Sequence, residues 1–343
     1  MLLTLCTIRQ LPQAIALGDS FSRHALQPNG QPVRVLIGLV DDPARLPADF
    51  VSPYPLLPVG EVLPAEQLTA LSAKYTPTEF AAACKPHVIA HVFRHFSDAD
   101  QLIYADPAIQ FMGPVTPVWE ALANATILLT PHITRSPASG PQPGGAWPDE
   151  KHFQNIGLYS ADFLAFRRSA ETDRFLAWWQ DRVTERAYID FCAGLCTDQI
   201  WLMHVPVFFR DVVVVKNPGW HLAIWNLPER SLQSLGTSWL VTGPMGQNQP
   251  LVFVNLKGLT NPNDGFFPHQ NRVKLPHQSD VQALLTACRS TLSARRLTFP
   301  EAQAPAYGKQ PEPVILRGWK RSTVQSLRLV TRFLDQVPLP AIR

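Results

Sequence analysis

The sequence predicts an α/β protein with a mixed β-sheet flanked by helices, and three observations support this prediction. Short apolar runs alternate with longer stretches of helical periodicity through the first half of the chain. Short β runs then follow one another closely in the second half, which favours antiparallel pairing there. The chain has 343 residues, 46% hydrophobic and 17% charged, which is a globular composition with enough length for a substantial core.

The first half alternates strands and helices. Residues 2–8, "LLTLCTI", are typical of a buried strand, and a helix is predicted to follow through about residue 25. A long helix is predicted over 76–96, with Thr76 or Thr78 as its cap and a kink at Pro86. The other elements predicted up to residue 130 are strands within 33–42, 54–63, 101–106 and 126–130, and helices over 65–74 and 117–124.

The second half begins with a strand region over 155–168 and a helix over 169–187, which Ser169 starts with an imperfect capping box. Residues 197–209 favour a helix and a turn. Four short β runs are predicted at 211–217, 221–227, 238–243 and 250–256.

Composition and missing motifs exclude several classes of protein. A net charge of +3 gives no general field for polyanions, so no nucleic-acid partner is expected. The five cysteines lack zinc-site spacing and are expected to be buried thiols in a reducing compartment. No leader pattern opens the chain and no 18-residue apolar run occurs, which favours a cytoplasmic protein. GxGxxG, P-loop and GxSxG motifs do not occur, which argues against dinucleotide oxidoreductases, P-loop kinases and α/β-hydrolases.

Polar residues stand at the ends of three predicted strands. Asp41 and Asp42 end the second strand, Asp106 ends the strand "QLIYAD", and Asn255 lies near the end of "PLVFVNL". Ligands of open α/β sheets bind outside the carboxyl ends of the strands. Each position also has a plain structural interpretation, since Asp-Pro is a common turn and the aspartates before Pro43 suit a solvated loop.

Longer stretches resemble bacterial GT-A glycosyltransferases related to family 8. The most specific of them are "CTDQIW" and "NPGWHLAIWNLPER", and the likeness extends over roughly residues 1–275. The resemblance implies a GT-A fold, a nucleotide-sugar donor, most readily a UDP-sugar, and retention of anomeric configuration. It also implies a setting in the assembly of cell-surface polysaccharide or lipopolysaccharide.

The resemblance implies a divalent metal, usually manganese with magnesium as the alternative, held at a strand-end Asp-x-Asp. Only Asp106 of that motif is present here, because Ala108 stands at the second position and Asn255 stands where the family has a histidine. Hard cations prefer anionic oxygens, so the metal site is degenerate. A metal-independent mechanism is the alternative, in which Lys257, beside Gly258, pairs with a donor phosphate as a point charge.

The resemblance also implies which residues contact the donor sugar and which are catalytic. It implies that Asp198 and Gln199 lie beneath the anomeric carbon, where Asp198 binds sugar hydroxyls or stabilises positive charge. Lys85 would reach the donor phosphate or sugar, and Asn155 with Gly157 would contact the transferred sugar. Each residue also has a structural alternative. The Asp198 segment could be a helix N-terminus with Thr197 as its cap. Lys85 could be a surface lysine before a helix kink, and Asn155 could be a polar strand start with a bulge. Asp41 is expected at the nucleotide's base or ribose.

The acceptor is expected near His221, Trp225 and Asn226, in "WHLAIWNL". Tryptophan rings match the apolar face of a pyranose, and His221 is a candidate general base. The alternative is a core β-strand with inward tryptophans. His132, in "TPHIT", is open in the same way.

The predicted domains are a catalytic domain over 1–275 and a helical extension over 276–343. Within the extension, residues 317–337 are basic and apolar at near-helical spacing. This segment either lies on an anionic membrane that carries lipid-linked acceptors or docks its apolar side on its own domain.

The function predicted from the sequence is that of a hexosyltransferase-type glycosyltransferase that moves a sugar from a nucleotide-sugar donor to a glycan or lipid-linked acceptor. The alternative is a non-catalytic nucleotide-sugar or glycan-binding protein derived from such an enzyme, because two expected metal ligands are replaced.

Overall fold

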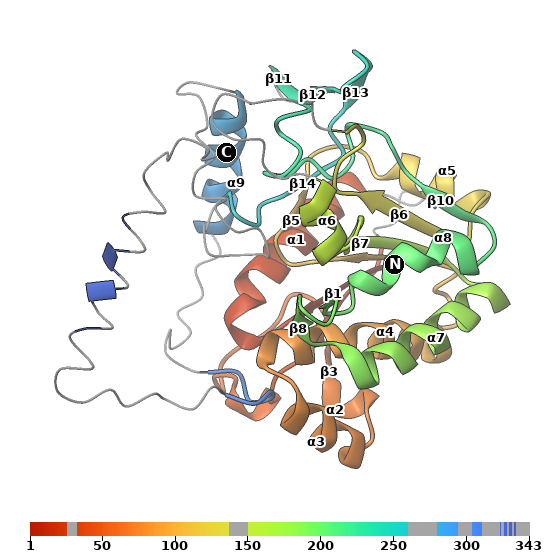
Figure 1. Cartoon of the computed structure of the whole chain (residues 1–343), viewed down its shortest axis with the longest axis vertical. Coiled ribbons are helices and arrows are strands. Elements are labelled where there is room, and N and C mark those ends of the chain that lie inside the picture. Colours follow the sequence, from red (N-terminus) through yellow and green to blue (C-terminus); the bar gives the residue numbers. More distant parts are fainter. Residues whose placement is uncertain are drawn as a thin grey trace.

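A computed structural model describes residues 1–25, 33–136, 150–236, 238–259, 280–293 and 304–310, with six single positions between 323 and 333. The predicted α/β class is confirmed: a central, mostly parallel sheet is flanked by helices (Figure 1). In the described residues this sheet has seven strands in the order β10-β6-β7-β4-β1-β2-β3. Their bounds are β1 Leu2–Cys6, β2 Val35–Leu39, β3 Leu56–Pro58, β4 Gln101–Ala105, β6 Ile127–Pro131, β7 Tyr159–Arg167 and β10 Val212–Val214.

One strand of the sheet runs against the others. β7 pairs antiparallel with both β4 and β6, whereas the remaining neighbours pair in parallel. The beginning of β7 therefore lies at the same edge as the carboxyl ends of the parallel strands. This edge is where the candidate site forms.

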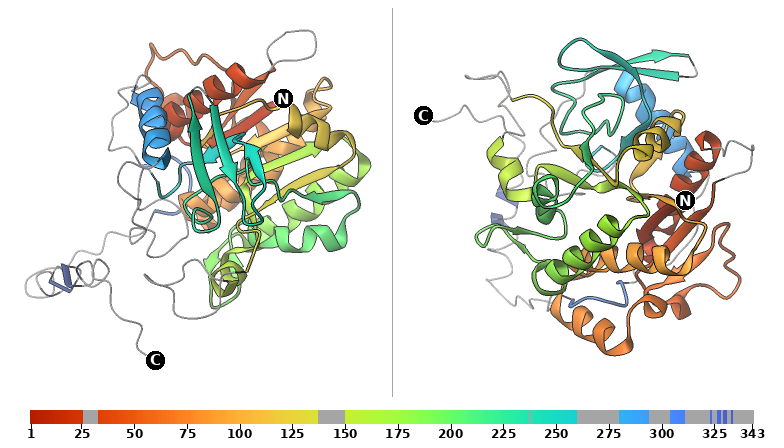
Figure 2. Two further views of the ribbon diagram at one scale, coloured as in Figure 1. Left: turned by 90° about the horizontal axis from the view of Figure 1, so that it is seen from above. Right: turned by 90° about the vertical axis from the view of Figure 1, so that its right-hand side faces the viewer.

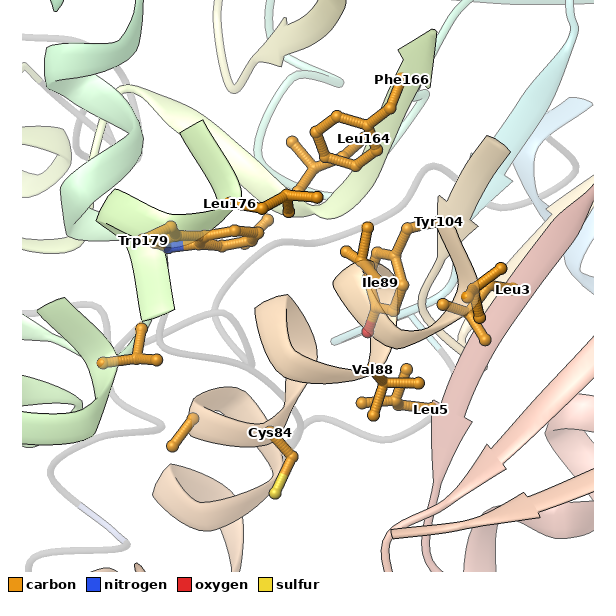
Figure 3. Close-up of a cluster of buried hydrophobic side chains, with 14 of the residues drawn as sticks. Leu3, Leu5, Cys84, Val88, Ile89, Tyr104, Leu164, Phe166, Leu176 and Trp179 are labelled. Atoms are coloured by element: carbon orange, nitrogen blue, oxygen red, sulfur yellow. The ribbon is translucent and has the colours of Figure 1, made fainter. Parts of the chain in front are cut away.

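Both faces of the sheet are covered by helices, because its strands are apolar on both faces. Leu3, Tyr104 and Phe166 face α4 (Pro77–His95) and α7 (Ala170–Arg186), and Figure 3 shows these side chains meeting in one cluster. Residues one position away along the strands pack on the opposite face, with α1 (Leu11–His24) and α5 (Thr116–Ala123). The alternation follows the two-residue period of a strand.

Local signals start the two long helices. Glu79 Oε2 accepts hydrogen bonds from the Thr76 backbone N–H and hydroxyl, at 2.9 and 2.8 Å, so Thr76 caps α4 as predicted. Pro86 lies inside α4 and leaves the helix continuous to His95. Ser169 Oγ accepts the Thr172 N–H at 3.1 Å and caps α7.

Smaller strands complete the fold. β11, β12 and β13 form an antiparallel ribbon at one end of the molecule (Figure 2). β14 pairs antiparallel with β5, and β8 pairs with β9. Their bounds are β5 Ile109–Phe111, β8 Ile189–Asp190, β9 Leu195–Cys196, β11 Ser231–Leu235, β12 Ser238–Thr242, β13 Asn248–Pro250 and β14 Phe253–Asn255.

The remaining helices are short or peripheral. They are α2 Val59–Val62, α3 Ala65–Lys74, α6 Glu150–Ile156, α8 Val205–Phe208, α9 Asp280–Ser293, and the 3-10 turns η1 Ile8–Gln10, η2 Pro43–Arg45 and η3 Ile200–His204. Leu284, Leu285 and Cys288 of α9 pack in one buried cluster with Trp225 and Val254. The helix that follows the predicted boundary at 275 thus packs on the body that precedes it, and the boundary itself stays a prediction.

One predicted strand begins later than expected, and another was wrong. Residues 150–156 form α6, so Asn155 lies in a helix and the strand begins only at Tyr159. Residues 221–227 form turns with a single bridge from Leu222 to Val254, because His221 has a left-handed φ of 56° and Asn226 closes the loop.

The C-terminal prediction falls mostly outside the described residues. Within 317–337, the described positions are helical, and Leu327, Val330 and Phe333 are 60%, 53% and 66% exposed. Among the helices that the structure describes, none combines the length and apolar character needed to cross a bilayer.

Candidate active site

Asp106 ends β4 and forms a turn as well as part of a charged cluster. Its Oδ1 accepts the Ala108 N–H at 2.9 Å, which is the hydrogen bond of an Asp-initiated turn. Its backbone N–H donates to the Asp162 carbonyl at 2.8 Å. The turn leaves Oδ2 for a partner from another part of the chain.

Asp162 is a site residue that sequence reasoning missed. It lies near the start of β7, and the register that pairs Ala105 with Phe163 places it opposite Asp106. Because β7 is antiparallel, its beginning meets the carboxyl end of β4. The only signal in the sequence is a carboxylate within an otherwise apolar strand, "SADFLAF".

Lys257 joins the two carboxylates. Its Nζ lies 2.7 Å from Asp106 Oδ2 and 2.6 Å from Asp162 Oδ1. The pairing of β14 with β5, extended by the Leu256 N–H to Ala108 carbonyl hydrogen bond of 2.9 Å, brings this lysine beside the Asp106 turn. The side chains of Lys257, Asp106 and Asp162 are 24%, 18% and 14% exposed, so the cluster lies at the surface edge of the sheet.

The three charges shift one another's pKa. Burial lowers the pKa of Lys257, but the two carboxylates raise it more, and the net shift is upward. Burial raises the pKa of Asp162, yet Lys257 outweighs it and the net shift is downward. For Asp106 burial prevails over Lys257, and its pKa is raised. Lys257 therefore keeps its positive charge throughout the neutral range.

A second layer of polar groups orients Asp162. Asn255 Nδ2 donates to Asp162 Oδ2 at 2.8 Å and to His221 Nε2 at 3.1 Å. Because His221 Nε2 accepts, its Nδ1 carries the proton and donates to Thr130 Oγ1 at 2.8 Å. Burial lowers the pKa of His221 to about 3, which keeps the ring neutral.

Lys85 and Asp198 form a second, more deeply buried ion pair. Lys85 Nζ lies 2.6 Å from Asp198 Oδ2, and the two side chains are 7% and 4% exposed. The same ammonium donates to the Ala161 carbonyl at 2.9 Å and lies 4.8 Å from the centre of the Tyr104 ring. Lys85 is thus a buried residue of α4 and not a surface lysine.

The two ion pairs are neighbours. Ala161, which binds Lys85, directly precedes Asp162, which binds Lys257. Burial raises the pKa of Tyr104 well above its usual value, and the charges of Asp106, Asp198 and Asp162 raise it further. The sequence-predicted residues Lys85, Asp106, Asp198 and Lys257 therefore gather at one edge of the sheet.

Gln199 and Gly157 fix the backbone beside Asp198. Gln199 Nε2 donates to the Ile156 carbonyl at 2.7 Å, and its Oε1 accepts the Ala161 N–H at 3.1 Å. Gly157 has a φ of 105°, and a Cβ there would lie 3.1 Å from the Gln199 carbonyl oxygen. The close approach explains why glycine occupies this position.

The other predicted donor residues, Asn155, Gly258 and Asp41, are not members of the two ion-pair clusters described above. Asn155 is exposed on α6, and Gly258 has a φ of 74° in the turn after Lys257. Asp41 is 4% exposed, and its carboxylate accepts backbone N–H groups of Ile8, Asp42 and Ala306 at 3.2, 2.9 and 2.8 Å.

The predicted acceptor residues are interior. His221, Trp225 and Asn226 are 1%, 2% and 0% exposed. The side-chain amide of Asn226 accepts the Ala223 N–H and donates to the carbonyls of His132 and His221. The expected acceptor face is therefore corrected: these side chains build the loop and the core beneath Asn255. His132 is also buried, and its pKa is lowered by burial to about 4.

The residues expected to hold a divalent metal do not fit one. Asp106 Oδ2 is occupied by Lys257, the Ala108 side chain has no ligand atom, and the Asn255 oxygen accepts the Lys257 N–H at 3.0 Å. In the described residues no group of three or more His, Cys, Asp or Glu side chains is arranged to hold a metal.

Comparisons with known proteins give distant likenesses. No family model matches the chain. An uncharacterised protein of Bacillus subtilis (strain 168), YfnD, is 23% identical over 195 residues, and the match spans 55% of this chain and 57% of that protein, a little over half of each.

Solved glycosyltransferases are among the similar structures. The galactosyltransferase LgtC, in complex with donor and acceptor sugar analogues, is 12% identical with a TM-score of 0.48, over 88% of this chain and 98% of that one. The bifunctional glycosyltransferase WbbM is 14% identical with a TM-score of 0.40, over 65% and 39% of the two chains. Mouse xyloside xylosyltransferase 1 is 12% identical with a TM-score of 0.33, over 65% and 86%. Likeness at this level establishes neither a family nor an activity.

Proposed function

We propose that the protein is a GT-A glycosyltransferase that uses a nucleotide-sugar donor. The observation that carries the proposal is the pair of adjacent ion pairs, Lys85–Asp198 and Asp106–Lys257–Asp162, at the carboxyl edge of the sheet. Open α/β sheets bind nucleotides outside this edge. Two ammonium groups set among carboxylates suit a ligand that carries both phosphates and sugar hydroxyls.

The donor diphosphate binds on the Lys257 side and the sugar on the Asp198 side. Cations stabilise the negative charge that grows on a diphosphate as it leaves. Lys257 is the more exposed of the two lysines, so it meets the charged diphosphate, whereas the buried Lys85 holds Asp198 in place. The Asp198 carboxylate then accepts hydrogen bonds from sugar hydroxyls or faces the positive anomeric carbon.

Transfer proceeds with retention, because the acceptor attacks the anomeric carbon on the same face from which the leaving group departs. The bond from the anomeric carbon to the donor phosphate oxygen breaks, and its electron pair stays on that oxygen. An acceptor hydroxyl oxygen forms the new bond to the anomeric carbon, and its proton passes to the leaving phosphate oxygen. Gln199, held by Ile156 and Ala161, positions the backbone next to Asp198.

The acceptor is a hydroxyl of a glycan or a lipid-linked glycan in cell-surface polysaccharide assembly. This part of the proposal rests on the resemblance of "CTDQIW" and its neighbours to family 8. The basic, apolar segment 317–337 would bring the enzyme to a membrane that carries such acceptors.

The test is a panel of UDP-, GDP-, CMP- and dTDP-sugars, each with and without Mn²⁺. A bound donor raises the melting temperature by mass action. Release of nucleotide from the stabilising donor is then measured for the wild type, Asp198→Asn, and Asp181→Asn, which changes an exposed aspartate of α7 in the same way. We expect Asp198→Asn to lower turnover by about two orders of magnitude or more while remaining folded, and Asp181→Asn to keep it.

A non-catalytic nucleotide-sugar-binding protein is the second candidate, because the Asp198 carboxylate is already paired with Lys85 within the chain. It predicts a donor that raises the melting temperature without any release of nucleotide. If no donor raises the melting temperature, both candidates are wrong.

A further inference from the structure

We propose that the Lys257 ammonium takes the place of a divalent cation, so that the donor diphosphate binds without metal. This inference rests on the proposed function, since it concerns the donor side of the same site. Its basis is the disagreement between the metal that the GT-A resemblance implies and the side chains that occupy its position.

The ammonium fills the position that a cation would need. Nζ contacts Asp106 Oδ2 and Asp162 Oδ1 at 2.7 and 2.6 Å, which uses one oxygen of each carboxylate. The other oxygens are also occupied, because Asp106 Oδ1 accepts the Ala108 N–H and Asp162 Oδ2 accepts from Asn255. A divalent ion entering here would meet a positive charge and few oxygens able to approach it.

The surrounding residues support a lysine and disfavour a metal. Asn255 turns its NH₂ toward Asp162 and His221, and its oxygen toward the Lys257 backbone. The histidine is fixed by the same contacts, since its Nε2 accepts from Asn255 and its Nδ1 donates to Thr130. No lone pair of this histidine is therefore directed at the cluster.

Lys257 keeps the capacity to bind a phosphate. An ammonium has three N–H donors, and two of them serve the two carboxylates. The side chain is 24% exposed at the sheet edge, so a phosphate can approach it, and the third donor is the one assigned to a phosphate oxygen. Asp106 and Asp162 hold the Lys257 ammonium in place. The diphosphate can therefore bind without a metal ion.

The experiment uses the full chain and two probes, UDP and inorganic pyrophosphate, titrated in EDTA and in Mn²⁺. We expect the wild type to bind UDP in EDTA, with Mn²⁺ changing the affinity by less than about tenfold. Lys257→Ala should weaken UDP and pyrophosphate in EDTA by about tenfold or more, because a charge-assisted hydrogen bond is lost. Lys216→Ala, which removes an exposed lysine beyond β10, is the matched control and should bind like the wild type.

Electron paramagnetic resonance of Mn²⁺ without nucleotide gives a readout that does not depend on activity. Wild-type protein should leave the signal of the aqueous ion unchanged. Lys257→Ala uncovers one oxygen of each carboxylate and removes the positive charge, so it should take up more Mn²⁺ than the wild type. If Lys257→Ala does not fold, the wild-type titrations in EDTA and Mn²⁺ still decide.

The outcomes separate this inference from the proposed function. UDP binding that requires Mn²⁺, or uptake of Mn²⁺ by the wild type, overturns the inference and leaves the glycosyltransferase proposal standing. Binding of UDP in EDTA that Lys257→Ala leaves unchanged also overturns it. Failure to bind any nucleotide of the donor panel, in either condition, overturns both.

Discussion

Two buried side chains, Lys85 and Asp198, carry opposite charges 2.6 Å apart at the centre of the candidate site. Each is desolvated, so each depends on the other for compensation. We expect Lys85→Met and Asp198→Leu each to lower the free energy of unfolding by about 3–5 kcal/mol. The double variant should recover part of that loss, because no uncompensated charge remains.

A double-mutant cycle by chemical denaturation measures this coupling. The double variant should stay inactive even where its stability returns, which separates the structural from the catalytic role of Asp198. If the losses of unfolding free energy in the two single variants add up to the loss in the double variant, the ion pair would be contradicted.

The glycine next to Gln199 offers a second test. Gly157→Ala strains a φ of 105° and sets a Cβ 3.1 Å from the Gln199 carbonyl oxygen. Gly194 has a φ of 70° with nothing within 4 Å, so Gly194→Ala measures the cost of the backbone conformation alone. We expect Gly157→Ala to cost about 1 kcal/mol more than Gly194→Ala and to reduce turnover as well. Equal losses of unfolding free energy in the two variants would contradict this account of Gly157.

At the level of residues, motifs pointed to several members of the candidate site, whereas members whose place depends on strand pairing were missed. Asp106 and Asp198 stand within quoted motifs and Lys257 directly follows one, and the structure brings them to one edge of the sheet. Asp162 could not be predicted, because its place opposite Asp106 follows from the antiparallel register of β7. The interior position of Trp225 could not be predicted either, since an apolar run is compatible with both a core and a sugar platform.

Among the elements, a segment far along the chain packs against the N-terminal half. Residues 304–310, here called the strap, contact that half at several places. The Ala306 N–H donates to Asp41 Oδ1 at 2.8 Å, the Gly308 N–H donates to Ser72 Oγ at 3.0 Å, and the Tyr307 ring lies 5.6 Å from that of Phe80. The strap thus occupies the carboxylate that was predicted to bind the nucleotide.

Gly308 allows the strap to approach Pro77 closely. Gly308 has a φ of 97°, and a Cβ there would lie 2.5 Å from Pro77 N. Gly308→Ala should release the strap and speed amide hydrogen exchange within 304–310 by about tenfold or more. Gly246→Ala, at a φ of 76° with nothing within 4 Å, is the control and should leave exchange in the strap unchanged. Unchanged exchange in Gly308→Ala would show that the strap is held elsewhere.

Helices were predicted better than strands for a physical reason. α3 spans Ala65–Lys74 as predicted, and α4 begins after Thr76, because periodicity and caps are local signals. β11 and β13 were missed, since their polar, exposed residues lack the apolar run of a core strand. Their pairing with β12 is a tertiary contact that local propensity does not encode.

For the whole molecule, buried histidines predict a loss of stability in mild acid. Burial lowers the pKa of His87 and His132 to about 4 and that of His221 to about 3, from 6.5. Below pH 6.5 the unfolded chain therefore binds protons that the folded chain does not. As a result, the free energy of unfolding decreases as the pH is lowered. The slope approaches about 1.4 kcal/mol per pH unit for each histidine between pH 6.5 and 4.

Chemical denaturation at pH 8, 6 and 5 measures this slope. His87→Gln should lower the slope by about the contribution of one proton. His95→Gln, at an exposed position of the same helix, should lower it less. Stability that stays constant from pH 8 to 5 would contradict the burial of these rings.

The proposed function requires that a nucleotide diphosphate docks at the sheet edge formed by Asp106, Asp162 and Lys257. A crystal structure grown with UDP in EDTA tests it most directly. We expect density for the diphosphate within hydrogen-bond distance of Lys257 Nζ, on the side toward Asp198. A nucleotide bound at another surface, with Lys257 still held only by its two carboxylates, would contradict it.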